Sequence, residues 1–306
     1  MCGILGVSTL NKNTKPIIPF LAWAMQSRGS DSWGASNGVE VIKHMGKIRK
    51  SFYLPSNWSQ NPVFVHTRAA SRGVVNIENA HPHMIGNIIG IHNGTLSNHS
   101  ELNAKYSRNH DVDTAHIFHH ISEGLELDDI SGTAVLAWFD KEHPGQMFLC
   151  RINSSSLDVV KLKTGEIIFA SEMIPIQESV AMGGGEIEAE YIIDPGMVYR
   201  IDSKTGDLYK TNRQYKFKTA QTYTHSNANL WHGHVHSGGN TGTYRSYQLI
   251  DKKKCFACLG VLSNGSYICD SCVEKHWFTA ETTVDLWQKE KELHPRDSGP
   301  GLVLVH

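Results

Sequence analysis

Residues 1–6 read Met1-Cys-Gly-Ile-Leu-Gly6, which puts a cysteine at the second position and a short apolar run after it. Removal of Met1 would place a thiol and a free α-amine on one residue, Cys2. An α-amine has an ordinary pKa of about 8, so it is partly neutral at physiological pH and can accept the thiol proton. Cys2 would then act as nucleophile and base together, which predicts thiol-based nucleophilic catalysis.

The composition indicates a globular protein with more than one domain. The chain has 306 residues, about twice the length of an average domain. Hydrophobic residues make up 40% of it and charged residues 19%, which suits a buried core and excludes a disordered or fibrous chain. The net charge of −1 provides no global field for nucleic acid or anionic membranes. The sequence shows neither a membrane-spanning run nor a secretory signal and predicts a cytoplasmic protein.

Short apolar runs bounded by turn residues dominate the first two thirds of the chain. They predict strands over residues 3–8, 63–67, 88–92, 133–140, 146–152, 157–162, 166–171 and 197–202. Apolar residues at helical spacing predict helices over residues 16–27 and 113–121. Many strands in series with few helices favour an α+β fold with antiparallel sheet over an alternating βαβ fold.

Six blocks with chemistry-bearing side chains follow one another along this part of the chain. They are Met1-Cys-Gly-Ile-Leu-Gly6, Arg28-Gly-Ser-Asp-Ser-Trp-Gly34, His66-Thr-Arg-Ala-Ala-Ser-Arg-Gly73, Asn79-Ala-His-Pro-His83, His92-Asn-Gly-Thr-Leu-Ser-Asn-His99 and Asp111-Val-Asp-Thr114. Together they closely resemble the glutaminase domain of the class II glutamine amidotransferases, which are N-terminal-nucleophile hydrolases typified by glucosamine-6-phosphate synthase. The resemblance covers residues 2–212 and implies a four-layer αββα sandwich.

The resemblance also implies a role for each matching residue. Cys2 would attack the side-chain amide of L-glutamine, release ammonia and leave a glutamyl thioester for water to hydrolyse. Asn93 and Gly94 match the oxyanion hole, whose donors are worth roughly 3 to 4 kcal/mol each. Arg68 matches the arginine that binds the substrate α-carboxylate, a task suited to a planar fork of donors. Asp113 matches the carboxylate that receives the substrate α-ammonium.

Each of these residues also has a plain structural interpretation when taken alone. Asn93-Gly94 is a common turn dipeptide, Arg68 could form a surface ion pair, and Asp113 could cap the helix that follows it. The joint order of the blocks favours the catalytic interpretation. We assign supporting roles to Arg28, Gly29 and Asp31 beside the nucleophile, and scaffold roles to His81, His83, His92 and His99.

The sequence departs from the synthase pattern in two places. Ala69 replaces the tryptophan that follows the motif arginine and gates the ammonia passage in the synthase, and Arg72 replaces a histidine. The residues beyond 212 are too few for the large acceptor domains of the relatives. We therefore expect ammonia to pass to a separate acceptor or synthase protein.

The C-terminal third contains two pairs of cysteines after a polar tract. We interpret residues 213–250 as a flexible His/Ser/Gly-rich linker, residues 251–293 as a metal-bound ribbon followed by a helix, and residues 294–306 as a tail. The predicted ligands are the four thiolates of Cys255, Cys258, Cys269 and Cys272. Two CxxC pairs suit one structural zinc ion held tetrahedrally. The alternatives are a redox-active or merely structural set of thiols, or His276 as one of the ligands.

The partner of this ribbon is less clearly indicated than its metal. Lys252, Lys253 and Lys254 form its only basic run, so protein docking is favoured over nucleic-acid binding. The alternating His232, His234 and His236 in the linker fit a solvated tract better than a metal site.

Two rival functions remain open. In one, an inactive glutaminase-like domain serves as a scaffold whose ribbon recruits a protein or nucleic-acid partner. In the other, the Cys2 thiol cleaves a different amide.

Overall fold

The computed structural model describes residues 2–49, 52–153, 156–202 and 205–218, together with the backbone of residues 303–305. The chain divides into two compact units, one of Met1–Thr219 with Thr283–His306 and one of Ala220–Thr282. Every element described below belongs to the first unit. Of the predicted C-terminal segments, the linker from residue 219 onward and the cysteine ribbon with its helix (residues 251–293) lie outside the described residues, whereas linker residues 213–218 are described.

Fourteen strands form two sheets, and every strand pairing in the described part of the chain is antiparallel. The first sheet has the order β11-β9-β10-β1-β4-β2-β3-β14. Its strands are β1 (Gly3–Val7), β2 (Ser32–Ser36), β3 (Val41–Met45), β4 (Val63–Arg68), β9 (Asp158–Leu162), β10 (Ile167–Ala170), β11 (Ile187–Tyr191) and β14 (Val303–Val305).

The second sheet has the order β13-β12-β8-β7-β6-β5. Its strands are β5 (His83–Ile85), β6 (Ile88–Leu96), β7 (Gly132–Asp140), β8 (Gln146–Ile152), β12 (Met197–Asp202) and β13 (Leu208–Gln214). The helices are α1 (Ile17–Met25), α2 (His99–Lys105), α3 (Thr114–Ser122) and α4 (Met173–Met182), with short 3₁₀ turns at Gln26–Arg28 and Ser56–Trp58.

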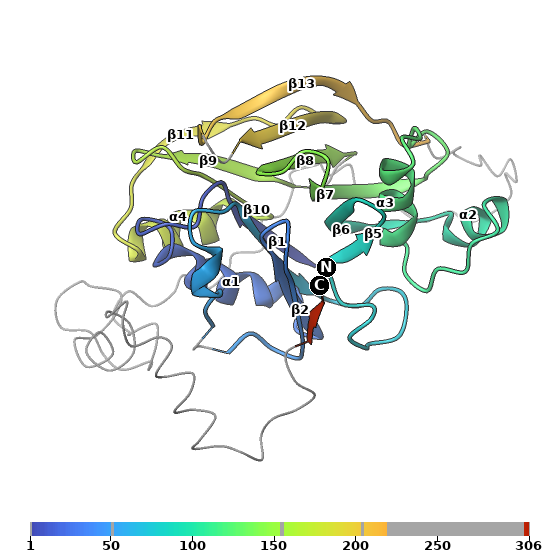
Figure 1. Ribbon diagram of the computed structural model, residues 1–306, viewed down its shortest axis with the longest axis horizontal. Coiled ribbons are helices and arrows are strands. Elements are labelled where there is room, and N and C mark those ends of the chain that lie inside the picture. Colours follow the sequence, from blue (N-terminus) through green and yellow to red (C-terminus); the bar gives the residue numbers. More distant parts are fainter. Residues whose placement is uncertain (1, 50–51, 154–155, 203–204, 219–302, 306) are drawn as a thin grey trace, which may run out of the picture. The chain divides into compact units, whose positions relative to one another are not determined.

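Three apolar clusters separate four layers. The first joins α1 and α4 to one face of the first sheet, with Leu21 and Ile176 among its buried residues. The second fills the space between the sheets, where the Phe64 and Phe139 rings stack with centroids 4.7 Å apart. The third joins the outer face of the second sheet to α2 and α3, as with Phe118. Figure 1 shows α1 with α4 and α2 with α3 on opposite sides of the described part. The layering is thus αββα, and the α+β fold with antiparallel sheets is as predicted.

The elements that sequence patterning missed have weak or mixed patterns. β2 is the small-residue stretch Ser32–Ser36, and β13 is the polar stretch Leu208–Gln214 with mostly exposed side chains. α4 carries Pro175, which a helix tolerates here because the residue lies in the first turn. β2 is nevertheless almost wholly buried between β3 and β4, and β13 is held by its pairing with β12, so neither strand depends on an alternating apolar pattern.

The folded core extends beyond the predicted boundary at residue 212. β13 runs to Gln214, and Tyr215 and Phe217 are buried in the third cluster, with 1% and 8% of their surface exposed. The Lys218 N–H donates to the Ile130 carbonyl at 2.7 Å. Within the predicted tail, residues 303–305 pair antiparallel with β3 at the edge of the first sheet. Among the described helices, none is long and apolar enough to cross a membrane.

Candidate active site

A pocket in the described part of the chain collects residues from the chain before β1, the end of β4 with the loop after it, β6, and the start of α3. It is lined by Cys2, Arg68, Ala69, Ser71, Arg72, His81, His92, Gly94, Val112, Asp113 and Thr114. Four of the five predicted catalytic and substrate-binding residues therefore face one space, although they are widely separated in sequence. The fifth, Asn93, is adjacent to Gly94 on β6.

Cys2 lies immediately before β1, with its side chain only partly exposed. Its Sγ donates to the Ala69 carbonyl oxygen, with the two atoms 3.4 Å apart. Burial raises the pKa of the Cys2 thiol above its ordinary value, and the nearby Arg68 charge opposes that rise. The resting group is consequently a thiol rather than a thiolate at neutral pH, so attack on a substrate requires a base to remove its proton.

Arg28 holds the backbone of the candidate nucleophile. Its Nε donates to the Cys2 carbonyl oxygen at 2.8 Å, and its guanidinium pairs with Glu172. The neighbouring Gly29 packs against the chain after β4, where an added Cβ would lie 2.4 Å from the Ala69 nitrogen. Only glycine permits this approach. The structural contacts thus agree with the supporting roles that we assigned to Arg28 and Gly29.

Asn93 and Gly94 lie on β6 where it passes the pocket. The Asn93 side chain is 7% exposed, and its Nδ2 donates to Ser171 Oγ at 3.3 Å. The same hydroxyl accepts a bond from the Ile4 N–H at 3.0 Å, so Ser171 links Asn93 to β1. A Cβ on Gly94 would lie 2.0 Å from the Thr133 carbonyl oxygen, which excludes any larger residue. One of the two Asn93 amide hydrogens remains for another acceptor.

Arg68 ends β4 with 3% of its surface exposed. Its two terminal nitrogens donate to the carbonyl oxygens of Arg72, at 2.8 Å, and Val74, at 3.3 Å. These bonds fold the loop after β4 around the guanidinium. Because the guanidinium has five N–H donors, this loop uses only part of its capacity. Arg68 can therefore both shape the pocket wall and receive an anionic group.

Asp113 is the N-cap of α3, where its Oδ1 accepts the Thr114 N–H at 3.0 Å. Its Oδ2 accepts the Leu96 N–H at 2.8 Å. The structural interpretation of Asp113 as a helix cap is therefore correct. The same carboxylate also lines the pocket, so capping and a role in binding a cation are compatible.

Two buried histidines, His81 and His92, line the pocket, and the rings of His66 and His83 pack against His81. His81 Nε2 and His92 Nδ1 each lie 3.1 Å from Thr114 Oγ1, while the His66 and His81 rings stack with centroids 3.8 Å apart. Burial lowers the pKa of His66 to about 3 and that of His81, His83 and His92 below the ordinary value. These rings are neutral at pH 7, which suits the scaffold role predicted for His81, His83 and His92.

Sequence reasoning missed the hydroxyls of Thr114 and Ser171, which orient pocket residues. The available signal for Thr114 was its position in the block Asp111-Val-Asp-Thr114, directly after the predicted site residue Asp113. Among the described side chains, no three His, Cys, Asp or Glu residues are grouped to hold a metal ion. The predicted ligands Cys255, Cys258, Cys269 and Cys272 lie outside the described residues.

Comparisons with known proteins identify relatives by sequence. No protein-family model matches the chain. Glutamine–fructose-6-phosphate aminotransferase [isomerizing] of Methanosarcina acetivorans is 33% identical over 205 residues, which is 56% of this chain and 33% of that protein. The enzyme of the same name from Thermococcus kodakarensis is 31% identical over 238 residues, covering 68% of this chain and 38% of its own length. The chain thus spans about a third of the length of these curated relatives.

A solved structure, the glutamine phosphoribosylpyrophosphate amidotransferase from B. subtilis, matches 69% of this chain and 49% of its own with 16% identity and a TM-score of 0.48. The similarity of the chain to class II amidotransferases therefore rests on the sequence relatives and the ordered motifs, not on this partial structural match. Over 56% to 68% of its length, the chain is similar in sequence to the glutamine–fructose-6-phosphate aminotransferases.

Proposed function

We propose that this chain hydrolyses L-glutamine through a Cys2 thioester and supplies the released ammonia to an acceptor on another protein. The single observation that supports this most strongly is the pocket shared by Cys2, Arg68, Gly94 and Asp113. It combines a nucleophile, a cation, a backbone donor and an anion, which are the groups needed to hold an amino acid by both charged ends beside a thiol.

In the proposed reaction, Met1 is removed and the α-amine of Cys2 takes the thiol proton, directly or through water. Sγ then bonds to the side-chain amide carbon of glutamine, and the amide oxygen becomes an oxyanion. The Gly94 N–H and the Asn93 side-chain amide stabilise this charge. The protonated amine gives its proton to the leaving nitrogen, and ammonia departs as the C–N bond breaks.

Water completes the cycle. The α-amine deprotonates a water molecule that attacks the thioester carbon, and a second oxyanion forms at the same site. The C–S bond then breaks, and the protonated amine returns its proton to Sγ, which gives glutamate and the Cys2 thiol. Arg68 binds the α-carboxylate through its unused N–H groups, and Asp113 accepts the α-ammonium. The histidines beneath the pocket take no proton in this scheme because burial keeps them neutral.

The test measures glutamate release by the purified chain together with the intact mass of its N-terminus. We expect activity only in preparations that lack Met1, and we expect Cys2→Ser to abolish most of it because a hydroxyl is a much weaker nucleophile here. Full activity with Met1 retained would exclude the N-terminal mechanism. Cleavage of other amides but not glutamine would support the rival hydrolase, and a folded but inactive chain would support the scaffold.

We also propose that Cys255, Cys258, Cys269 and Cys272 bind one structural zinc ion in a ribbon that docks the acceptor protein. The support is the spacing of the two CxxC pairs, since a short unit with little apolar material needs a metal to order it. Metal analysis should find one zinc per chain, and the Cys255→Ser/Cys258→Ser variant should lose it while retaining glutaminase activity. Loss of glutamine hydrolysis in a variant with an intact core would contradict this modular arrangement.

A further inference from the structure

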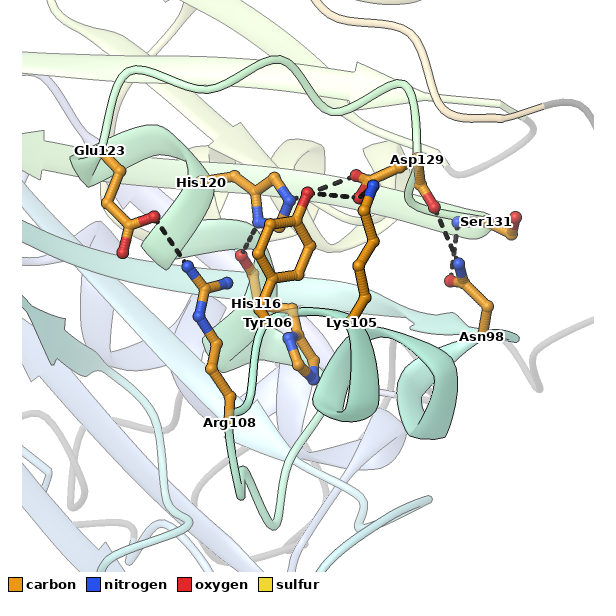
Figure 2. Close-up of polar contacts among 9 residues, drawn as sticks. All are labelled: Asn98, Lys105, Tyr106, Arg108, His116, His120, Glu123, Asp129 and Ser131. Carbon is orange, nitrogen blue, oxygen red and sulfur yellow. Dashed lines mark hydrogen bonds and ion pairs between the residues drawn. The ribbon is translucent and has the colours of Figure 1, made fainter.

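A buried contact joins α3 to the loop that precedes β7, six residues along the helix from the pocket residue Thr114. His120 Nε2 on α3 lies 3.2 Å from Asp129 Oδ1. The His120 side chain is fully buried, and that of Asp129 is 20% exposed. Neither atom has an aligned hydrogen-bond partner, so the attraction between them depends on charge. Figure 2 shows both side chains with the polar residues around them.

The other ring nitrogen of His120 determines where the proton lies. His120 Nδ1 is 2.7 Å from the His116 carbonyl oxygen, and a carbonyl oxygen can only accept a hydrogen bond, so Nδ1 carries a hydrogen. A neutral His120 ring would then direct the bare lone pair of Nε2 at a carboxylate oxygen. The contact is attractive only when Nε2 also carries a proton, which makes His120 an imidazolium.

Asp129 is the anion of this pair. Its Oδ2 accepts a hydrogen bond from the Tyr106 hydroxyl at 2.6 Å and pairs with Lys105 Nζ at 2.9 Å. Burial opposes ionisation of Asp129, but the hydrogen bonds from Tyr106 and Lys105 outweigh it and hold the pKa of the carboxyl below its ordinary value. The proton between the two residues therefore belongs to His120.

The remaining charged and titratable groups nearby either reinforce this arrangement or are paired elsewhere. The Tyr106 ring lies edge-on to His120, with centroids 4.9 Å apart, and carries the Arg108 guanidinium 4.6 Å from its centre. Arg108 in turn pairs with Glu123 at 2.7 Å. The titratable groups that interact with His120 are Tyr106, His116, His119 and Asp129, while Lys105 pairs with Asp129 and Arg108 with Glu123.

The same segment is tied to the strand that passes the pocket. The Asp129 carbonyl oxygen accepts from Asn98 Nδ2 at 2.8 Å, and the Ser131 N–H donates to Asn98 Oδ1 at 2.9 Å. Asn98 follows β6, the strand of Asn93 and Gly94. The backbone of Asp129 is thus bonded to Asn98 just after β6, and its carboxylate contacts His120 on α3.

We propose that the His120 imidazolium and the Asp129 carboxylate form a positioning pair, which holds α3 so that Asp113 at its N-terminus keeps its place beside β6. The catalytic part of this inference rests on the proposed glutaminase function. If the pair is broken, α3 loses its charged tie to the β6 end, and the candidate ammonium site moves relative to Gly94. Glutamine binding then weakens, whereas the thiol chemistry at Cys2 is less affected.

The first test requires no activity and uses the full chain labelled with ¹⁵N-histidine. NMR at pH 7 should show both His120 nitrogens protonated, with the signals assigned by their loss in His120→Gln. In Asp129→Asn the ring should become a neutral tautomer with its proton on Nδ1. A single protonated nitrogen in the unmodified chain, or no change in Asp129→Asn, would overturn the pairing.

The second test follows the Leu96 and Thr114 amides, which donate to Asp113. Asp129→Asn and His120→Gln should speed their hydrogen exchange about tenfold, a coupling typical of residues in one network. Asp128→Asn is the matched control because it removes the same charge from the exposed neighbouring residue. Equal exchange in all three variants would show that the pair does not position Asp113.

The kinetic test separates this role from general stability. Asp129→Asn should raise the KM for glutamine about tenfold with a smaller change in kcat, and Asp128→Asn should leave both unchanged. Equal KM values for Asp129→Asn and Asp128→Asn would contradict the inference. Absence of glutamine hydrolysis in the unmodified chain would refute the proposed function, while the NMR and exchange results would still decide the pairing.

Discussion

The Leu96 N–H donates to Asp113 Oδ2 at 2.8 Å, which ties the last residue of β6 to the N-cap of α3. Asp113 Oδ1 accepts the Thr114 N–H. A carboxylate with both oxygens bound to backbone donors keeps a fixed orientation, and its remaining lone pairs can accept from a cation. Asp113, the candidate ammonium-binding residue, is thereby fixed directly to β6, the strand that carries the candidate oxyanion-hole residues Asn93 and Gly94.

The first prediction concerns the charge of Asp113. Asp113→Asn retains an acceptor for one of the two backbone N–H groups but removes the anion and the second acceptor. The KM for glutamine should therefore rise about 10- to 100-fold, as expected for loss of a charge-assisted hydrogen bond. The effect on kcat should be smaller. Steady-state glutamate release measures both parameters, with Asp128→Asn as the control for loss of one acidic charge. An unchanged KM in Asp113→Asn would exclude this residue from substrate binding.

The second prediction concerns Asn93. Asn93→Ala should lower kcat about 100-fold or more with little change in KM, because its amide acts on charge that develops in the transition state. Ser171→Ala should have a smaller effect of the same kind, since Ser171 Oγ accepts from the Asn93 amide and orients it. If Asn93→Ala instead raises KM alone, the residue contributes to binding rather than to the oxyanion hole.

The third prediction concerns acid stability. Burial lowers the pKa of His66 from 6.5 to about 3, so the unfolded chain takes up a proton near pH 6.5 while the folded chain does not. The resulting stability is complete above about pH 6.5 and is lost as the pH falls toward 3. Urea unfolding should show that His66→Phe reduces the pH 7 to pH 5 loss of unfolding free energy by about 2 kcal/mol.

The control for this measurement is His143→Gln, which removes a histidine that is exposed and pairs with Asp140 at the surface. If the unfolding free energy of His66→Phe depends on pH as it does in the unmodified chain, burial does not lower the pKa of His66. The assignment of a neutral His66 in the folded protein would then be wrong.

The fourth prediction concerns the boundary of the core. A chain ending at residue 218 retains Phe217, which is 8% exposed, and the Lys218 bond to Ile130. A chain ending at residue 215 loses both and should be less stable by about 1.5 to 3 kcal/mol, the value of burying one large apolar side chain. Chemical denaturation of the two truncations measures this difference. Equal stability would place the boundary nearer residue 212, as the sequence suggested.

Much of the fold follows from patterns that the sequence displays directly. Strands such as β8 and β12 have the predicted bounds because their apolar side chains alternate with the sheet period or fill the space between the sheets. β2 escaped prediction because its residues are small, and it forms a strand because β3 and β4 supply its hydrogen bonds from either side. Long-range pairing of this kind leaves no local signal.

The candidate site likewise has a part that the sequence predicts and a part that it does not. Its residue types were readable because the blocks occur in family order, and the pocket brings Cys2, Arg68, Gly94 and Asp113 together. The link from Asn93 to Ser171, and the pair of His120 with Asp129, join residues from separate elements. No spacing rule predicts such contacts, since they depend on how sheets and helices pack.

The central claim is that Cys2 carries the glutamyl group, and rapid acid quenching followed by peptide mass spectrometry tests it directly. The chain mixed with glutamine should yield an N-terminal peptide that lacks Met1 and whose Cys2 is heavier by one glutamyl group, and Cys2→Ser should not form this thioester. Glutamate release that continues in Cys2→Ala, with no adduct on the N-terminal peptide of the unmodified chain, would contradict the account.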